Sequence, residues 1–247
     1  MGEPDSRARL IVGRCAAPGT ETELSREEAA HARARRLARG QTVTLIDGTG
    51  TEARGILLRL TGGGGRVLVE EILPPRRSPP RITLLVAGLK PERLSWIAEK
   101  ATELEAAVLT VVSTDRTQRF RASAGFVERL TRVAREAAKQ CGRATWPSIS
   151  GPRELADVLS EEAEGTRLFL DPQARTFPSL LEAPLAMLIG PEGGWTGPER
   201  DAARDAGWTP AALPGGVLRA ETAAIAALVL ARAALETGKR ETENGKR

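Results

Sequence analysis

A proline-rich segment divides this chain of 247 residues into two parts with different sequence patterns. Residues 73–80, LPPRRSPP, contain four prolines, each of which fixes φ and removes a backbone donor, so the segment cannot form a helix. Prolines at this density favour extended backbone, and we interpret the segment as a linker. The chain length allows one large domain or two modest ones, and the linker favours two.

The part before the linker has the pattern of a small β-rich domain. Three runs with β-type residues are separated by turn signals such as Asp47-Gly48 and the glycines at 62–65. The runs are TVTLIDGTG (42–50), ARGILLRL (53–60) and RVLVEEIL (66–73). A short helix is expected before them, over REEAAHARARRLA at 26–38.

After the linker, apolar runs alternate with helical segments, a pattern typical of a parallel sheet with helices on both faces. The runs are RITLLVAGL (81–89), AVLTVVS (107–113), RLFLD (167–171), LAMLIG (185–190) and PAALPG (210–215). The sequence therefore predicts an α/β fold for this part.

Two of these runs lead into glycine turns followed by helices, LIGPEGGWTGPER at 188–200 and LPGGVLRAETAA at 213–224. Glycines after a buried strand let the main chain approach a ligand closely, and ligands of open α/β sheets bind at the carboxyl ends of strands. Together the turns predict a pocket with main-chain walls, although either alone is commonly a tight strand-to-helix connection. Neither has the GxGxxG or GxxxxGK[ST] spacing of nucleotide-binding loops.

Positive charge is unevenly distributed along the chain, on both sides of the linker: residues 1–147 carry a net charge of +8 and residues 148–247 one of −4. Such an asymmetry favours a polyanionic partner, although solvated charged faces would give the same count. A helix is expected near 122–141, with an apolar face and an outward basic face. The apolar face would contain Phe126, Leu130, Val133, Ala137 and Cys141; off it lie Arg129, Arg132, Arg135, Glu136 and Lys139.

Several classes of protein are disfavoured. No apolar run approaches the ~20 residues of a membrane span, and the charged N-terminus lacks the apolar core of a signal peptide, so we expect no membrane association and a cytoplasmic location. Cys15, Cys141 and the single histidine, His31, lack metal-ligand spacing, so no metal site is expected.

Four ordered motifs resemble one known family. LIGPEGG, LPGGVLRAETAAIAAL, EKATELEAAVLTVVSTDRTQ (99–118) and AREAAKQCGR (134–143) are similar to the bacterial 16S ribosomal RNA uridine N3-methyltransferases of the SPOUT superfamily. HARARRLARGQTVTLIDGTG at 31–50 is similar to the N-terminal barrel of that family, so the resemblance covers nearly the whole chain.

The resemblance implies a two-domain architecture. Residues 1–74 would form a PUA-like RNA-binding β-barrel, residues 80–240 a SPOUT methyltransferase domain with a parallel sheet and a deep trefoil knot, and residues 241–247 a polar tail. It also implies a homodimer, S-adenosylmethionine as cofactor and 16S rRNA of the small ribosomal subunit as partner. A knot would be one of the rare exceptions to the rule that chains do not thread their own loops.

The resemblance also assigns roles to residues. Arg219 would stabilise the uridine anion, with Glu221 and Glu192 as candidate bases, although an acid near a helix start is also explained by capping. Cofactor contacts are expected from Leu170, Ile189, Gly190, Glu192, Gly193, Leu213, Gly215, Val217, Leu218, Arg219, Ala220, Thr222 and Ala223. From the distribution of positive charge, and not from the resemblance, RNA contacts are expected from Arg33, Arg35, Arg36, Arg116, Arg119, Arg129, Arg132 and Arg143.

The chain departs from the family pattern at two positions. Gly216 stands where relatives usually have an arginine, and Glu105 where glycine is common. Two other functions stay open: a SPOUT enzyme that methylates a ribose 2′-OH or another base, and a non-catalytic RNA-binding assembly factor that kept the fold. The intact GPEGG and LRAET turns argue against the second.

Overall fold

The computed structural model describes residues 8–117, 122–161 and 164–244. Its contacts divide the chain into two compact units. The first contains residues 1–78 and 135–146, and the second residues 79–134 and 147–247. The expected linker at 73–80 has no regular secondary structure, as its prolines predict. Arg119 lies outside the described residues.

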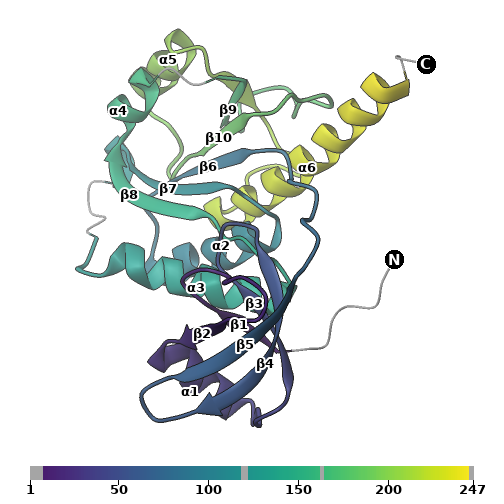
Figure 1. The fold of residues 1–247 in the computed structure, drawn as a ribbon. Coiled ribbons are helices and arrows are strands. Elements are labelled where there is room, and N and C mark those ends of the chain that lie inside the picture. The colour runs from purple at the N-terminus through teal and green to yellow at the C-terminus, as the bar shows by residue number, and fades with distance from the viewer. Residues whose placement is uncertain (1–7, 118–121, 162–163, 245–247) are drawn as a thin grey trace. The chain divides into compact units, whose positions relative to one another are not determined.

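The first unit is built on a curled, mixed sheet of five strands with the order β1-β3-β4-β5-β2 (Figure 1). The strands are β1 (Arg9–Ile11), β2 (Glu21–Leu24), β3 (Thr42–Ile46), β4 (Glu52–Leu60) and β5 (Gly65–Ile72). β1 and β3 are parallel, and the other pairs are antiparallel. The three runs predicted as strands are confirmed as β3, β4 and β5. β1 and β2 were not predicted because three or four residues show no alternation.

One helix, α1 (Arg26–Ala34), lies where a helix was predicted, but it is shorter. It begins because Ser25 caps it: the Ser25 hydroxyl accepts a hydrogen bond from Glu28 N at 3.1 Å. It ends before Arg36, whose φ of 57° is left-handed and cannot continue a helix.

The prediction of an outward basic face on helix α3 (Phe126–Cys141) is wrong at Lys139. The Lys139 side chain is buried within the first unit, and its Nζ lies 3.0 Å from Glu28 and 2.6 Å from Glu136. Glu28, also buried, accepts a second hydrogen bond from Ile11 N. A buried charge requires such partners. The buried partner, Glu28, lies in α1, far away in sequence. Cys141, expected on the apolar face, is exposed instead.

The second unit is an α/β structure with a six-stranded parallel sheet, as predicted. The strand order is β11-β9-β10-β6-β7-β8. The strands are β6 (Ile82–Ala87), β7 (Val108–Ser113), β8 (Ser148–Glu154), β9 (Thr166–Leu170), β10 (Leu185–Ile189) and β11 (Thr209–Ala211). Five of them match predicted runs. β8 was missed because its sequence, SISGPRE, contains a Gly-Pro pair typical of a turn.

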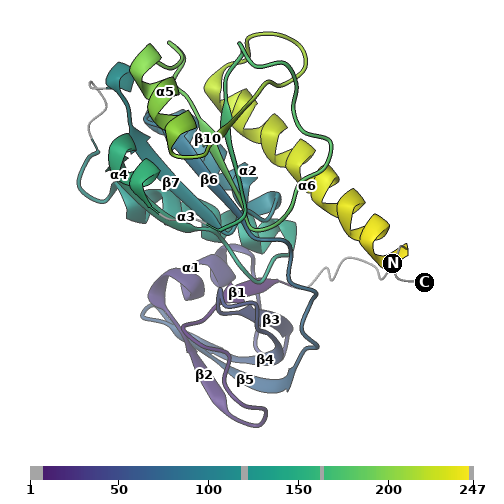
Figure 2. The ribbon, with the colours of Figure 1, turned by 90° about the horizontal axis from the view of Figure 1, so that it is seen from above.

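Helices cover both faces of this sheet (Figure 2), as the alternation predicted. Side chains of β10 alternate between two cores: Leu185, Met187 and Ile189 belong to one and Leu188 to the other. The first core is covered by α2 (Pro91–Glu103) and α6 (Ala220–Asn244), and the second by α4 (Leu155–Ser160) and α5 (Gly197–Asp205). A strand with both faces buried is apolar throughout, which explains the continuous run LAMLI.

No helix in the described ranges is long and apolar enough to cross a membrane.

Candidate functional site

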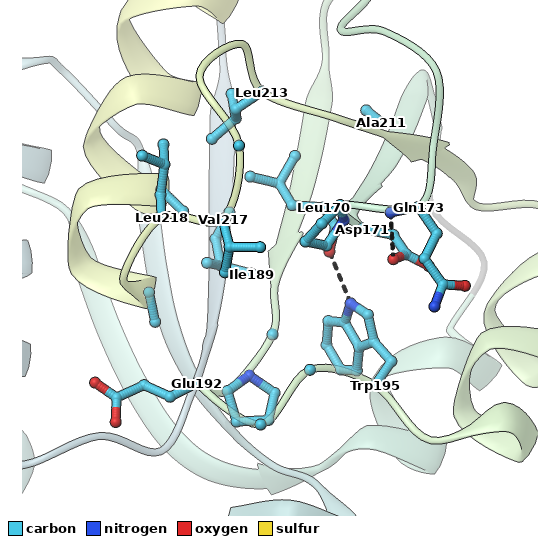
Figure 3. A pocket seen from close by; sticks show the side chains of 18 of the residues that line it. Leu170, Asp171, Gln173, Ile189, Glu192, Trp195, Ala211, Leu213, Val217 and Leu218 are labelled. Atoms are coloured by element: carbon cyan, nitrogen blue, oxygen red, sulfur yellow. Dashed lines mark hydrogen bonds between the residues drawn. The ribbon is translucent and has the colours of Figure 1, made fainter.

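A cavity of about 250 Å³ lies at the carboxyl ends of β9, β10 and β11 (Figure 3). Three connections line it: residues 170–173 after β9, 189–195 after β10 and 211–218 after β11. The two glycine turns follow β10 and β11, which are not adjacent strands, because β9 lies between them. The end of β9 therefore contributes a third wall, of which only Leu170 was predicted.

A buried carboxylate holds two of these connections together, those after β9 and β10. Asp171 is 1% exposed, and its Oδ2 accepts a hydrogen bond from Arg200 Nε at 2.7 Å. Arg200 Nη1 also donates to the Trp195 carbonyl at 2.8 Å. The Trp195 indole in turn donates from Nε1 to the Leu170 carbonyl at 2.8 Å (Figure 3). This Asp171–Arg200–Trp195 brace ties the turn after β10 to the end of β9.

The helix after this turn begins in a way that its sequence predicts. Thr196 and Glu199 form a capping box in which Glu199 N donates to the threonine hydroxyl and Thr196 N donates to the glutamate. The pattern Thr-x-x-Glu therefore fixes the first residue of α5, Gly197, and with it the length of the turn. Arg200, one turn into α5, is placed to reach Asp171.

The glycines of the two turns are required for different reasons. A Cβ at Gly190 would lie 2.8 Å from Trp195 Cε2, so the absence of a side chain admits the indole rather than opening the cavity. Gly215 and Gly216 have φ of 96° and 89°, which side chains rarely adopt, and have open space around them. An arginine in place of Gly216 would be strained on this backbone.

One arginine connects the two glycine turns. Arg93, in the first turn of α2, pairs with Glu192 of one turn, and its Nε lies 3.5 Å from Glu221 Oε1 of the other. Glu192 lies at the cavity rim with its carboxylate directed away from the apolar side chains (Figure 3). Glu221 Oε2 is buried and has no hydrogen-bond partner in the described part of the chain.

Most of the residues predicted to contact a cofactor line this one cavity. They are Leu170, Ile189, Gly190, Glu192, Gly193, Leu213, Val217, Leu218, Ala220 and Ala223. Gly215, Arg219 and Thr222 are not part of the lining. Ala220 and Ala223 of α6 face the cavity because they are three residues apart, whereas Thr222 of this helix and Arg219, which precedes it, are exposed.

The lining also includes residues that were not among the predicted cofactor contacts. These are Asp171, Pro172, Gln173, Pro191, Gly194, Trp195, Arg200, Ala211 and Gly216. Asp171 follows the predicted strand RLFLD directly and could have been chosen as a polar residue at a strand end. No signal in the sequence pairs it with Arg200, 29 residues later.

The arginines predicted to bind RNA are distributed over both units. In the first unit, Arg33, Arg35 and Arg36 are exposed, and burial together with nearby Arg76 lowers the pKa of Arg143. In the second unit, Arg116 and Arg132 are exposed, and Arg129 lies over the Phe126 ring at 5.8 Å. The described residues contain no cluster of three potential metal ligands.

Comparison with known proteins identifies the family. The family model for an RNA methyltransferase domain matches residues 76–232, which include the whole cavity. A ribosomal RNA small subunit methyltransferase E from Synechocystis is 31% identical over 211 residues, which cover 82% of this chain and 69% of that protein. The chain belongs to the small-subunit rRNA methyltransferase E family. Another such methyltransferase E, from Mycobacterium bovis, is 32% identical over 209 residues and matches 79% of its own length.

Solved structures agree with this family assignment. A protein from Legionella pneumophila, solved with bound SAM, has a TM-score of 0.86 and 30% identity and covers 92% of this chain. The match covers 98% of that chain. A methyltransferase E from Neisseria gonorrhoeae bound to S-adenosyl methionine has a TM-score of 0.84 at 23% identity, with 93% and 98% of the two chains covered. At that identity the likeness shows a shared fold.

The packing of Gly190 against Trp195 gives a first prediction. In Gly190→Ala the new methyl group must displace an indole that is hydrogen-bonded and buried, which should destabilise the protein by about 1–3 kcal/mol. Urea unfolding measures the loss of stability, and tryptophan fluorescence measures the displacement of the indole. Gly197→Ala is the matched control, because a Cβ there meets nothing within 4 Å and the residue begins a helix. Equal stability of the two variants would contradict the packing argument.

Proposed function

We propose that this protein uses S-adenosylmethionine to methylate N3 of a specific uridine in 16S rRNA of the small ribosomal subunit. The observation that carries the proposal is the cavity at the strand ends, whose walls are the two glycine turns and the end of β9, with main chain and apolar side chains in the lining. The family assignment and the SAM-bound structure at 30% identity support the cofactor. The protein would act in the cytoplasm, where small subunits are assembled.

The residues of the cavity fit the chemistry of this cofactor. Apolar walls from Leu170, Ile189, Leu213 and Leu218 suit an adenine ring, and neighbouring peptide groups suit its polar edge and the ribose. The cofactor supplies a methyl group on a sulfonium, so an unpaired cation in the cavity would be unfavourable. Arg200, the one cation among the described lining residues, is neutralised by Asp171.

The transfer forms a bond between uridine N3 and the methyl carbon as the bond from that carbon to sulfur breaks. Holding the two reactants in line supplies much of the acceleration. The N3 proton must leave to a base, and Glu221 and Glu192 are the proposed acceptors. Both carboxylates contact Arg93, but Glu221 is favoured because its Oε2 is buried without a hydrogen-bond partner in the described ranges, whereas Glu192 is exposed.

Arg219 is proposed to stabilise the uridine anion. It immediately precedes α6, and its carbonyl accepts the hydrogen bond of Ala223 N that starts the helix, so its backbone is fixed beside the cavity. Its side chain is exposed, which leaves it available to a bound RNA. A guanidinium next to developing negative charge stabilises the transition state more than the ground state.

The proposal includes the partners that the family resemblance implies. The predicted arginines, Arg119 among them, would hold RNA phosphates, and the curled sheet of the first unit supports a PUA-like role in RNA binding. The parallel sheet and its glycine turns are compatible with a trefoil knot. A homodimer is proposed because exposed Trp96 and Val229 lie on α2 and α6, helices that contact each other.

Identification of the methylated nucleoside tests this function. Small ribosomal subunits from a strain lacking the gene are incubated with the protein and methyl-deuterated S-adenosylmethionine, and the rRNA is digested to nucleosides for mass spectrometry. We expect labelled 3-methyluridine. Label in a 2′-O-methyl nucleoside or in another base would support the related SPOUT activity instead. Tight RNA binding without any label would support a non-catalytic assembly factor.

A substitution at Arg219 separates catalysis from binding. Arg219→Ala should lower the single-turnover rate at saturating RNA by roughly ten- to a thousand-fold, the range for loss of one charge-stabilising donor. The affinity for S-adenosylhomocysteine should not change, because the side chain lies outside the cavity lining. Arg204→Ala, which removes an exposed arginine of α5, is the control. A normal rate with weakened RNA affinity would make Arg219 a phosphate contact and refute the catalytic role.

A further inference from the structure

A second, larger cleft adjoins the cavity. It has a volume of about 780 Å³ and lies between the connection after β6, the start of α2 and the short 3₁₀ helix η1 (Asp115–Thr117). Its lining shares Pro191, Glu192 and Gly193 with the cavity, so one turn of main chain separates the two spaces. We call it the basic cleft, lined by residues 88–93, 116–117 and 191–193 other than Glu92.

The charges of the basic cleft favour an anion. Among the described residues, its lining contains three cations, Lys90, Arg93 and Arg116, and one carboxylate, Glu192. The charge of Arg93 is compensated by Glu192, with which it pairs, and by nearby Glu221. The electrostatic potential in the cleft is therefore set by Lys90 and Arg116. Both are exposed, and neither has a carboxylate partner within residues 8–117, 122–161 and 164–244. The net excess of positive charge therefore faces an open space.

Arg116 is held in place by contacts that also shape the cavity. The amide of Asp115 donates to Glu199 Oε1 at 2.9 Å, and Asp115 Oδ2 accepts from the Thr196 hydroxyl at 3.1 Å. The Arg116 guanidinium donates to the Gly193 carbonyl. A Cβ at Gly193 would lie 3.1 Å from Arg116 Cδ, so this glycine lets the arginine stem lie against the turn. The same turn thus positions a cation on one side and lines the cavity on the other.

We propose that the basic cleft binds the RNA nucleotide that carries the acceptor base, with its phosphate held by Lys90 and Arg116. This rests on the proposed function, in which the cavity holds the methyl donor. The phosphate fits the two cations, and Leu89, Pro91 and Pro191 offer apolar surface to the base and ribose. Because the cleft and the cavity share one wall, a nucleotide in the cleft lies next to the methyl donor without occupying its site.

Binding of a fluorescein-labelled decauridylate tests the site. Anisotropy titrations are made with wild type, Lys90→Gln, Arg116→Gln and the control Arg175→Gln, which removes an exposed arginine of the same unit outside the cleft. We expect each cleft variant to weaken binding about tenfold, as for the loss of a charge-assisted contact. The slope of log affinity against log salt should fall by about one for each lost phosphate contact. The control should stay within about twofold.

A crosslinking measurement locates the RNA. A decauridylate with one 4-thiouridine should crosslink to residues 88–93 or 191–193, and the crosslink should decrease in Lys90→Gln. Unchanged affinity in both cleft variants, or crosslinks only outside these segments, would overturn the proposal.

Calorimetry with S-adenosylhomocysteine distinguishes the two proposals. If the wild type does not bind this cofactor product, the proposed function fails, whereas loss of RNA affinity in Lys90→Gln still supports the cleft as an RNA-binding site. If the cofactor product binds normally and RNA affinity is insensitive to both substitutions, only the cleft assignment fails. Arg116 contacts the turn that the cleft and the cavity share. If Arg116→Gln also weakens binding of the cofactor product, the RNA affinity of Lys90→Gln alone tests the cleft assignment.

Discussion

The buried Asp171 carboxylate is the constraint on which the cavity depends. A charge with 1% exposure is tolerated only with a partner, and Arg200 supplies it at 2.7 Å. Loss of one member of such a pair costs about 3–5 kcal/mol, because the other charge is left buried. Since Arg200 also holds the Trp195 carbonyl, the ion pair sets the position of the turn after β10. The walls of the cavity after β9 and β10 are therefore positioned by a charge pair that is itself part of the lining.

Arg93 extends this arrangement to the second glycine turn. It contacts Glu192 of the first turn and Glu221 of the second, so the two turns are linked by one guanidinium. Arg116 contacts the first turn from the side of the basic cleft. Asp171, Arg200 and Glu192 of the lining thus act in ion pairs that fix main chain, so the described lining presents no unpaired cation to a sulfonium cofactor. Arg219 is the exposed cation that follows the second turn.

Local patterns in the sequence predicted much of the second unit. Strands such as β10 are buried on both faces, so a continuous apolar run marks them, and the glycine turns mark the strand ends where the cavity lies. The capping box at Thr196 is equally local. Glu105 stands where the family pattern has glycine, and its φ of 57° is a conformation that favours glycine. Its carboxylate pairs with Arg232, a residue far away in sequence.

Contacts between distant segments could not be predicted. The order of the sheet places β9 between β10 and β11, which added Asp171 and Gln173 to the cavity. Lys139 was expected at the surface because periodicity within one helix does not reveal a carboxylate supplied by α1.

Hydrogen exchange of backbone amides with and without S-adenosylhomocysteine tests the central claim most directly, because the proposed pocket is made of main chain. The account predicts slower exchange within 189–195 and 213–223 and no change in β4 and β5. Protection confined to other segments, or none at saturating ligand, would contradict it.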